Sequence, residues 1–293
     1  MPKLFCEAKR FSQGFFAKWQ KRLFVQLIVI FVLTQLLGIA VGTYLIGSIA
    51  TGVMEQPTFA TENPDDPINA IALLLYILFF TAFLLVFMHF FKGRLLFKAL
   101  ETMVTFTASW IVFQVFIGDF GLIFSIILVA WRLLRPKHVL LRNAAAIISI
   151  AGVGALIGVT LGVIPVAIFL ILLGCYDFIA VFKTKHMVTL AKGITKQNLA
   201  FTVAMPTPKH QFELGTGDLA LPLVFAVSTM KASQAIGFPS YLVPAGMILT
   251  ASLIGLLITI DYSGKHVGKA LPALPLQAVL MLGAFALSKA IGF

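Results

Sequence analysis

The chain has 293 residues, of which 60% are hydrophobic and only 11% charged, and its mean hydropathy is +1.01. A soluble domain of this size is about 45–50% apolar and about 25% charged, so an ordinary soluble enzyme, a disordered chain and a disulfide scaffold are excluded. Because about 20 apolar residues cross a bilayer as a helix, the composition predicts a multi-pass integral membrane protein.

A window of about 20 residues predicts nine apolar helices along the chain. They cover residues 23–50, 69–91, 95–117, 120–134, 141–161, 164–182, 217–236, 241–260 and 271–291. The first apolar stretch is too long for the core of a signal peptide, so we expect it to be retained. The fourth is the weakest, and spans three and four can instead form a re-entrant pair without changing the orientation of later helices. We therefore expect an all-α bundle of nine transmembrane helices.

The net charge is +11, and the positions of the basic residues along the chain indicate the orientation of the helices. All but two of the 22 Lys and Arg fall in the N-terminal segment or in connections that lie on one side of the predicted bundle; Lys231 and Lys289 are the exceptions. Basic residues concentrate on the cytoplasmic side of membrane proteins, so the N-terminus is predicted to be cytoplasmic and the C-terminus outside. Because the basic residues form no single face, no nucleic-acid partner is expected.

The whole chain, 1–293, is expected to form a single polytopic domain. Residues 1–182 hold helices one to six, 183–214 form a cytoplasmic connection, and 215–293 hold helices seven to nine. Within the connection, the apolar segment 199–205 is too short to span a bilayer. We expect it to lie at the interface or to form a strand near the functional site. Span five carries Gly154, Gly158 and Gly162 at intervals of four, which predicts close helix packing.

Acidic residues are scarce, and most of them fall in tails, loops or span ends. Glu101 lies one turn inside span three, within reach of the interface beside Lys98. The two acids predicted inside helices are Asp177 in span six and Asp218 in span seven. Counting about 1.5 Å per residue from the cytoplasmic boundary places Asp177 about 9 Å deep and Asp218 about 7–8 Å deep. A carboxylate at bilayer depth costs about 2.5–3.5 kcal/mol, so both residues are functional candidates.

Two carboxyls close together in a low dielectric cannot both ionise, so they share one proton. One carboxylate can then take a proton from a water while the other, protonated, polarises a carbonyl. This is the chemistry of aspartic proteolysis. Buried acids of this kind also serve proton- or cation-coupled transporters and ion-leak channels, which stay as the alternative.

The residues around the two acids favour proteolysis. Asp218 ends the run Gly215-Thr216-Gly217-Asp218, whose glycines allow another backbone to come close. Asp177 follows Tyr176, whose hydroxyl is a hydrogen-bond donor. The segment Pro272-Ala273-Leu274-Pro275 begins span nine on the same side of the membrane, where a first helical turn tolerates proline.

This ordered set of segments resembles the three signatures of the presenilin and signal-peptide-peptidase family, and the resemblance extends over essentially the whole chain. It implies intramembrane aspartic proteolysis with Asp177 and Asp218 as the catalytic pair and the proline-alanine-leucine segment shaping the site. The cytoplasmic N-terminus and the Pro-Ala-Leu-Pro form resemble the presenilin branch. The short N-terminal tail and short connection after helix six look like a compact microbial, archaeal-type homologue, which implies a location in a microbial cell membrane.

The resemblance implies an aspartic endopeptidase that cleaves within the transmembrane helices of protein substrates in the lipid bilayer. The short tail and connection argue against activating self-cleavage and against a need for accessory subunits, while homo-oligomer formation stays open. No His-Glu-x-x-His pattern for zinc occurs, and we expect neither metal nor cofactor. Neither a buried serine nor Cys175 has a histidine at its depth, so cleavage by a serine or cysteine nucleophile is not expected either. Segment 199–205 is a candidate to pair with an unwound substrate as a strand.

Overall fold

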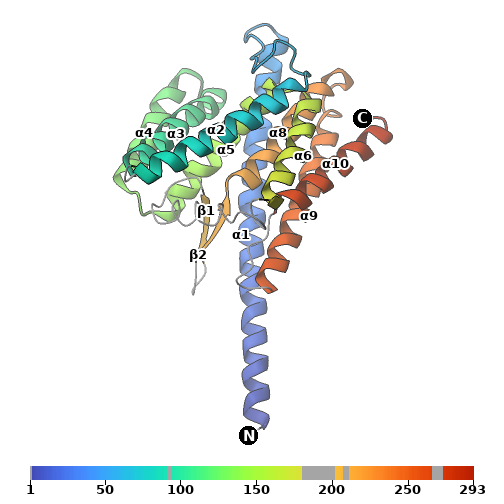
Figure 1. Cartoon of the computed structure of the whole chain (residues 1–293). Helices are drawn as coiled ribbons and strands as arrows, with labels where there is room; N and C mark the ends of the chain where they lie inside the picture. The colour runs from blue at the N-terminus through green and yellow to red at the C-terminus, as the bar shows by residue number, and fades with distance from the viewer. Residues whose placement is uncertain (1, 91–93, 180–201, 207–210, 266–272) are drawn as a thin grey trace.

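The computed structural model describes residues 2–90, 94–179, 202–206, 211–265 and 273–293. In these ranges it is almost entirely helical, with one two-stranded β-hairpin (Figure 1). The helices before the hairpin are α1 (Pro2–Ala50), α2 (Ile68–Phe90), α3 (Arg94–Ile117), α4 (Gly121–Leu134), α5 (Val139–Thr160) and α6 (Val163–Ile179). Strands β1 (Thr202–Pro206) and β2 (Gln211–Gly215) follow, and then α8 (Gly217–Ala232), α9 (Leu242–Lys265) and α10 (Leu274–Ala290). Two 3-10 turns, η1 (Gly118–Phe120) and η3 (Gln234–Ile236), complete the described elements.

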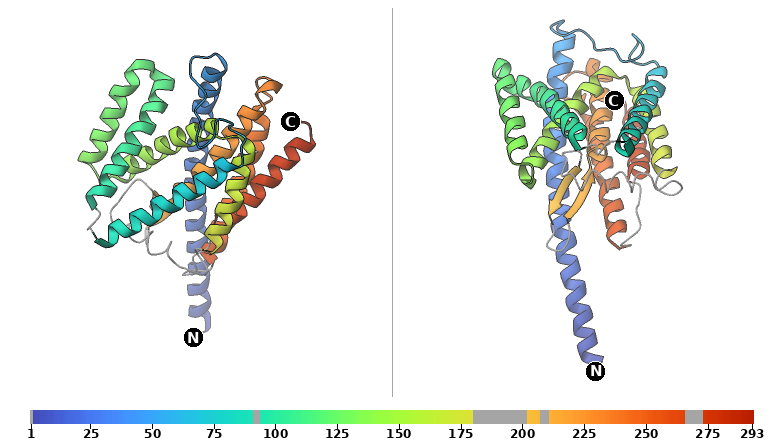
Figure 2. Two further views of the ribbon diagram at one scale, coloured as in Figure 1. Left: turned by 45° about the horizontal axis from the view of Figure 1, so that its top comes forward. Right: turned by 60° about the vertical axis from the view of Figure 1, so that its left-hand side comes forward.

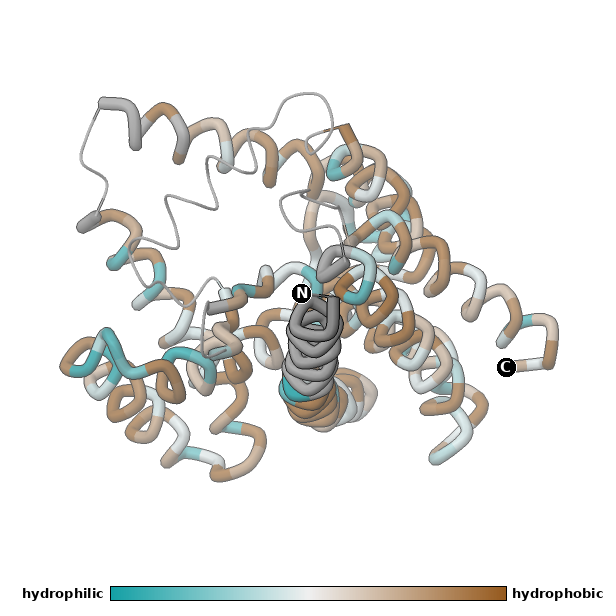
Figure 3. Tube along the Cα trace, turned by 90° about the horizontal axis from the view of Figure 1, so that it is seen from below, coloured by the Kyte–Doolittle hydropathy of each residue, from teal (hydrophilic) through white to brown (hydrophobic). Residues whose placement is uncertain are grey.

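Each of the nine predicted apolar segments is helical over most of its described length, so the all-α prediction is confirmed. Four stretches are long and apolar enough to cross a bilayer: Arg22–Ala50, Leu96–Leu134, Val139–Thr160 and Leu242–Tyr262. Three shorter apolar helices are Ile68–Leu84, Val163–Ile179 and Leu274–Ala290. Large apolar side chains cover much of the outside, including Leu75, Phe79 and Ile127. Hydrophobic residues line the helices of the bundle (Figure 3), as expected where lipid replaces water as the solvent.

The first helix is longer than predicted, because it begins at Pro2 instead of residue 23 and continues without a break to Ala50. It runs through the middle of the molecule and projects beyond the other helices at its N-terminal end (Figures 1 and 2). The C-terminus lies toward the opposite end of the bundle in these views.

Helices α3 and α4 form a tight antiparallel hairpin on one side of the bundle (Figure 2). The turn is possible because Gly118 adopts a positive φ of 63°, a conformation that side chains with a Cβ rarely take. Helix α4 has 14 residues, or about 21 Å at 1.5 Å per residue, which is shorter than a bilayer core of about 30 Å. The predicted weakness of the fourth span therefore corresponds to a short helix packed against α3.

The centre of the fold is the packing of α8 between α1 and α5. Leu223 and Val227 of α8 fit against glycines on both neighbours. A Cβ added at Gly154 of α5 would come within 2.8 Å of the Leu223 side chain, and one at Gly158 within 2.7 Å of Val227 Cβ. On α1, Gly38 faces Leu223 and Gly42 faces Val227 in the same way. These glycines let three backbones approach closely, so they fix the position of the helix that carries Asp218.

The prediction that glycines of span five allow close helix packing is confirmed for Gly154 and Gly158, but it is wrong for Gly162. Helix α5 ends at Thr160, so Gly162 lies at the turn into α6. Its N–H donates a hydrogen bond to the carbonyl of Pro64 at 2.8 Å, and a Cβ there would collide with Asp65. Gly162 therefore accommodates the connection between α1 and α2 instead of a neighbouring helix.

Strands β1 and β2 pair antiparallel, with Ala204 opposite Glu213 and Thr202 opposite Gly215. The predicted segment 199–205 is thus a strand from Thr202 onward, while 199–201 lie outside the described residues. Val203, Ala204 and Met205 are completely buried, and the first and last of these belong to the core that α1, α5, α8 and α9 share. The hairpin is consequently part of the core.

Replacing Gly158 by Ala is expected to lower the free energy of unfolding by about 1–3 kcal/mol, because the new methyl group would press on Val227 and on the carbonyl of Val224. The matched control is Gly283→Ala in α10, where an added Cβ meets no described atom within 4 Å and helix propensity favours Ala. The measurement is thermal unfolding in detergent. Equal melting temperatures for the two variants would contradict this account of helix packing.

Candidate active site

The β-hairpin delivers the chain directly to the first of the predicted aspartates. Strand β2 ends at Gly215, Thr216 is the N-cap of α8, and the helix begins at Gly217. Asp218 therefore lies in the first turn of α8, where the helix dipole favours a negative charge. Its position depends on how the hairpin and α8 are held.

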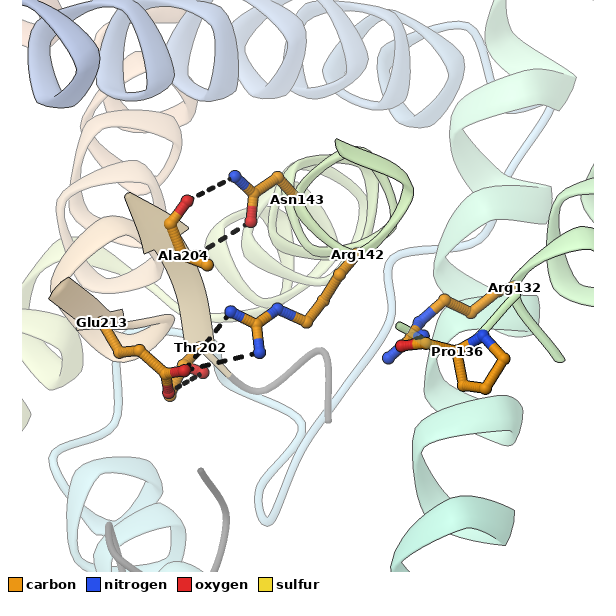
Figure 4. Close-up of polar contacts among 7 residues, drawn as sticks. All are labelled: Arg132, Pro136, Arg142, Asn143, Thr202, Ala204 and Glu213. Carbon is orange, nitrogen blue, oxygen red and sulfur yellow. Dashed lines mark hydrogen bonds and ion pairs between the residues drawn. The ribbon is translucent and has the colours of Figure 1, made fainter. Parts of the chain in front are cut away.

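Two neighbouring residues at the start of α5 hold the hairpin (Figure 4). The side chain of Asn143 donates to the carbonyl of Ala204 at 2.7 Å and accepts from the N–H of Ala204 at 2.9 Å. The guanidinium of Arg142 pairs with the carboxylate of Glu213 at 3.4 Å, and the Thr202 hydroxyl donates to the same carboxylate at 2.8 Å. A basic residue that the sequence analysis counted as an orientation signal is thus a buried anchor of the strand that leads to Asp218.

The second predicted aspartate, Asp177, lies near the end of the described part of α6 and is half-buried. Its carboxyl accepts a hydrogen bond from the backbone N–H of Leu274. Leu274 is the first residue of α10, and N–H groups of a first helical turn have no partner within their own helix. The start of α10 therefore offers a donor that helps to orient the Asp177 carboxyl.

The two aspartates lie close enough for the charge of Asp177 to act directly on the carboxyl of Asp218. Helix α6 packs against both α8 and α10, which brings the three segments together. At Gly174, one turn before Asp177, an added Cβ would lie 3.6 Å from the Cα of Pro275. The start of α10 therefore lies next to α6 one turn before Asp177, at the distance of an ordinary van der Waals contact.

The glycines before Asp218 leave space beside the carboxyl. A Cβ at Gly215 would meet only the Asp218 carboxylate among the described residues, at 3.6 Å, and one at Gly217 would meet no described atom within 4 Å. This room suits the approach of a further backbone. Tyr176 is half-buried next to Asp177 on α6.

The proline segment forms the start of α10 as predicted. Ala273 is the N-cap, and Pro275 occupies the first turn, where its missing N–H does not disturb the helix. Pro272 lies outside the described residues. Among the predicted site residues that the structure describes, those of α6, the start of α8 and the start of α10 lie together.

One buried acid of α3 was not predicted from the sequence. Glu101 was predicted to lie at the interface beside Lys98, but it is only 6% exposed and forms an ion pair with Arg132 at 2.9 Å, joining α3 to α4. Its partner comes from another helix, so the spacing along the sequence gives no signal for the pair. Within the described ranges, no three His, Cys, Asp or Glu side chains lie together in a way that can hold a metal ion.

An apolar groove lies between α6 and α10, next to the turn of α6 that carries Asp177. It has a volume of about 410 Å³, and Gly174, Cys175, Phe178, Pro275 and Ala278 are among its lining residues. Phe178 is largely exposed, so the groove opens on the outside of the bundle.

The fold matches two solved structures over nearly their whole length. A structure described as that of a presenilin family intramembrane aspartate protease in C222 space group superposes with a TM-score of 0.67 and 21% sequence identity, covering 92% of this chain and 99% of that chain. A structure described in the same words in P2 space group gives a TM-score of 0.65 and 21% identity, covering 90% and 96% of the two chains. At this identity the likeness establishes the fold. No curated protein matches the chain in sequence.

Residues 28–212 match the family described as signal-peptide peptidase, presenilin aspartyl protease. The matched range includes Asp177, whereas Asp218 and the proline segment lie beyond it. Fold and family together define the class of the protein, a multi-pass membrane hydrolase of the intramembrane aspartate protease type. The chain belongs to the signal-peptide peptidase and presenilin family of aspartyl proteases. Neither comparison supports the transporter or channel alternative.

Removing the Asn143 side chain is expected to loosen the hairpin, because both backbone groups of the buried Ala204 would lose their partner. Asn143→Ala is expected to lower the free energy of unfolding by about 1–3 kcal/mol and to speed amide exchange at Ala204. Hydrogen exchange in detergent measures this, with Asn63→Ala in the loop before α2 as the control. Unchanged protection of Ala204 would contradict the anchoring role.

Proposed function

We propose that this chain is an intramembrane aspartic endopeptidase in which Asp177 and Asp218 together activate a water molecule. The observation that carries the proposal is the meeting of three separate segments. The start of α10 donates a hydrogen bond to Asp177, and the charge of Asp177 acts on Asp218 at the start of α8.

The pair supplies every reactive group that peptide hydrolysis needs from the protein. One carboxylate takes a proton from water as the oxygen attacks the carbonyl carbon, and the other, protonated, donates to the carbonyl oxygen. When the C–N bond of the resulting gem-diol breaks, the carboxyl that took the proton from water gives it to the amine nitrogen, and the other carboxylate takes back a proton from a gem-diol hydroxyl. The pair shares one proton and titrates as a unit. The neighbouring residues are proposed to shape the site and to position the substrate; they are Tyr176, Gly215, Thr216, Gly217 and the segment 272–275.

The substrate is proposed to be a transmembrane helix that approaches from the lipid. The groove between α6 and α10 is lined almost entirely by apolar side chains and adjoins Gly174, one turn from Asp177. An apolar helix can lie there without exposing polar groups to lipid. The peptide bonds of a helix are protected by its own hydrogen bonds, so local unwinding must precede hydrolysis.

The hairpin changes the predicted pairing between the substrate and segment 199–205. Strand β2 covers one edge of β1, and Asn143 takes both backbone polar groups of Ala204 on the other. If the sheet accepts an unwound substrate as a further strand, β2 is therefore the better partner, and it leads directly to Asp218. Deletion of segment 199–205 cannot test this pairing, because Val203 and Met205 are completely buried in the core and their loss would disrupt the fold.

We further propose nine membrane crossings, with the N-terminus in the cytoplasm and the C-terminus outside. The distribution of basic residues supports this orientation. The two aspartates then lie in the cytoplasmic third of the membrane, which places the cleavage site there. The protein is proposed to form a single domain and to act without accessory subunits, as the short connection after α6 indicates.

Asp177→Asn and Asp218→Asn are each expected to reduce cleavage of a single-span substrate in liposomes by at least about 100-fold, because each removes one member of the pair that moves the proton. Asp119→Asn, at the exposed turn between α3 and α4, is the control and should cleave like the wild type. Substantial cleavage by either site variant would refute the catalytic pair. If no protein cleaves and ion flux depends on the two acids, the transporter or channel alternative is correct.

The orientation can be tested in a variant that carries Cys6→Ser and Cys175→Ser. With Glu62→Cys added in the loop between α1 and α2, a membrane-impermeant maleimide is expected to label intact cells. With Lys137→Cys added in the turn between α4 and α5, labelling should require permeabilised cells. The reverse pattern would overturn the predicted orientation.

A further inference from the structure

Helix α8 contains a proline that affects the backbone of the proposed catalytic aspartate. Pro222 lies inside the helix, four residues after Asp218. In an α-helix the N–H of a residue donates to the carbonyl four residues earlier, and proline has no N–H. The carbonyl of Asp218 is therefore the one that loses its helical donor. A buried carbonyl that has no hydrogen-bond donor destabilises the folded state, so a replacement donor is expected.

The missing donor comes from α10. The side-chain nitrogen Nε2 of Gln277 donates to the carbonyl of Asp218 at 3.3 Å and lies 3.2 Å from the hydroxyl oxygen of Ser252 on α9. Gln277 is completely buried. At Gly255 of α9, an added Cβ would lie 3.2 Å from the Cα of Gln277, so this glycine lets α9 pack against the glutamine.

Resting on the proposed function, we propose that Gln277 is a positioning residue, which substitutes for the helical donor that Pro222 lacks and so fixes Asp218 relative to Asp177. The start of α10 then contacts both aspartates. Its backbone N–H at Leu274 holds the carboxyl of Asp177, and one turn of chain later Gln277 holds the main chain of Asp218. A single rigid element sets the separation of the two groups that must share a proton.

General stabilisation of the helix bundle is the competing explanation for Gln277. The amide oxygen Oε1 of Gln277 is buried and has no partner among the described residues, so the contribution of the side chain comes from its donor end. A second buried glutamine provides a comparison. Gln35 of α1 donates to the carbonyl of Leu219 at 2.9 Å, one residue beyond Asp218 on the same helix. The two glutamines make the same kind of bond, but only Gln277 serves the carbonyl that Pro222 leaves without a donor.

The test uses Pro222→Ala, which restores an N–H directed at the Asp218 carbonyl. In the wild-type background, Gln277→Met keeps the length of the side chain but removes the donor, and kcat is expected to fall about tenfold with KM unchanged, since no substrate contact is lost. In the Pro222→Ala background, the same change is expected to lower kcat less than about threefold, because the new N–H takes over the carbonyl. Cleavage of a single-span substrate in liposomes measures both parameters.

Gln35→Met is the matched control, because Gln35 donates to the carbonyl of Leu219, which the N–H restored at position 222 does not serve. Its effect on kcat is expected to be equal in the two backgrounds. Thermal unfolding of the same set of variants in detergent checks that each is folded, and Gln277→Leu replaces Gln277→Met if that variant does not fold. An equal loss of kcat from Gln277→Met in both backgrounds, or no loss in either, would overturn the positioning role. If the wild type itself cleaves nothing, the proposed function fails and the positioning role falls with it.

Discussion

The close packing of α8 against α1 and α5 is the constraint on which the rest of the structure depends. Leu223 and Val227 fit against glycines of both neighbours, so α8 has little freedom to shift along or around its axis. Between helices in a membrane, lipid tails compete for apolar contacts, and close approach of backbones replaces the hydrophobic effect as the source of specificity. Asp218, five residues before Leu223 and nine before Val227 on the same helix, takes its position from these contacts.

Polar contacts then connect this framework to the candidate site. Arg142 and Asn143 of α5 hold the hairpin that enters α8, while Leu274 and Gln277 of α10 reach the two aspartates. In an apolar surrounding, each buried polar group requires a partner, so a few hydrogen bonds are sufficient to select one arrangement of helices. The same helices leave an apolar groove between α6 and α10, whose lining includes Gly174, one turn before Asp177.

Much of this protein follows from the order of its residues. Long apolar runs are stable in a bilayer only as helices, because every backbone group must be satisfied inside the segment, so the boundaries of most helices agree closely with the structure. The three short motifs around Asp177, Asp218 and Leu274 could be found for a similar reason. Charged residues are rare in such a chain, and the depth of each is readable from its distance to the nearest helix end.

What the sequence alone determined is therefore the helical class of the protein, its family and the residues proposed for catalysis. The tertiary structure decided which groups meet. Glu101 pairs with Arg132, Arg142 with Glu213, and Gln277 with the carbonyl of Asp218, over separations of 31, 71 and 59 residues. No local sequence pattern predicts these pairs, because each polar group loses its contact with water, and so requires a partner, only when the helices pack. The role of Pro222 shows the difference: its missing N–H is evident from the sequence, but the donor that replaces it is known only from the fold.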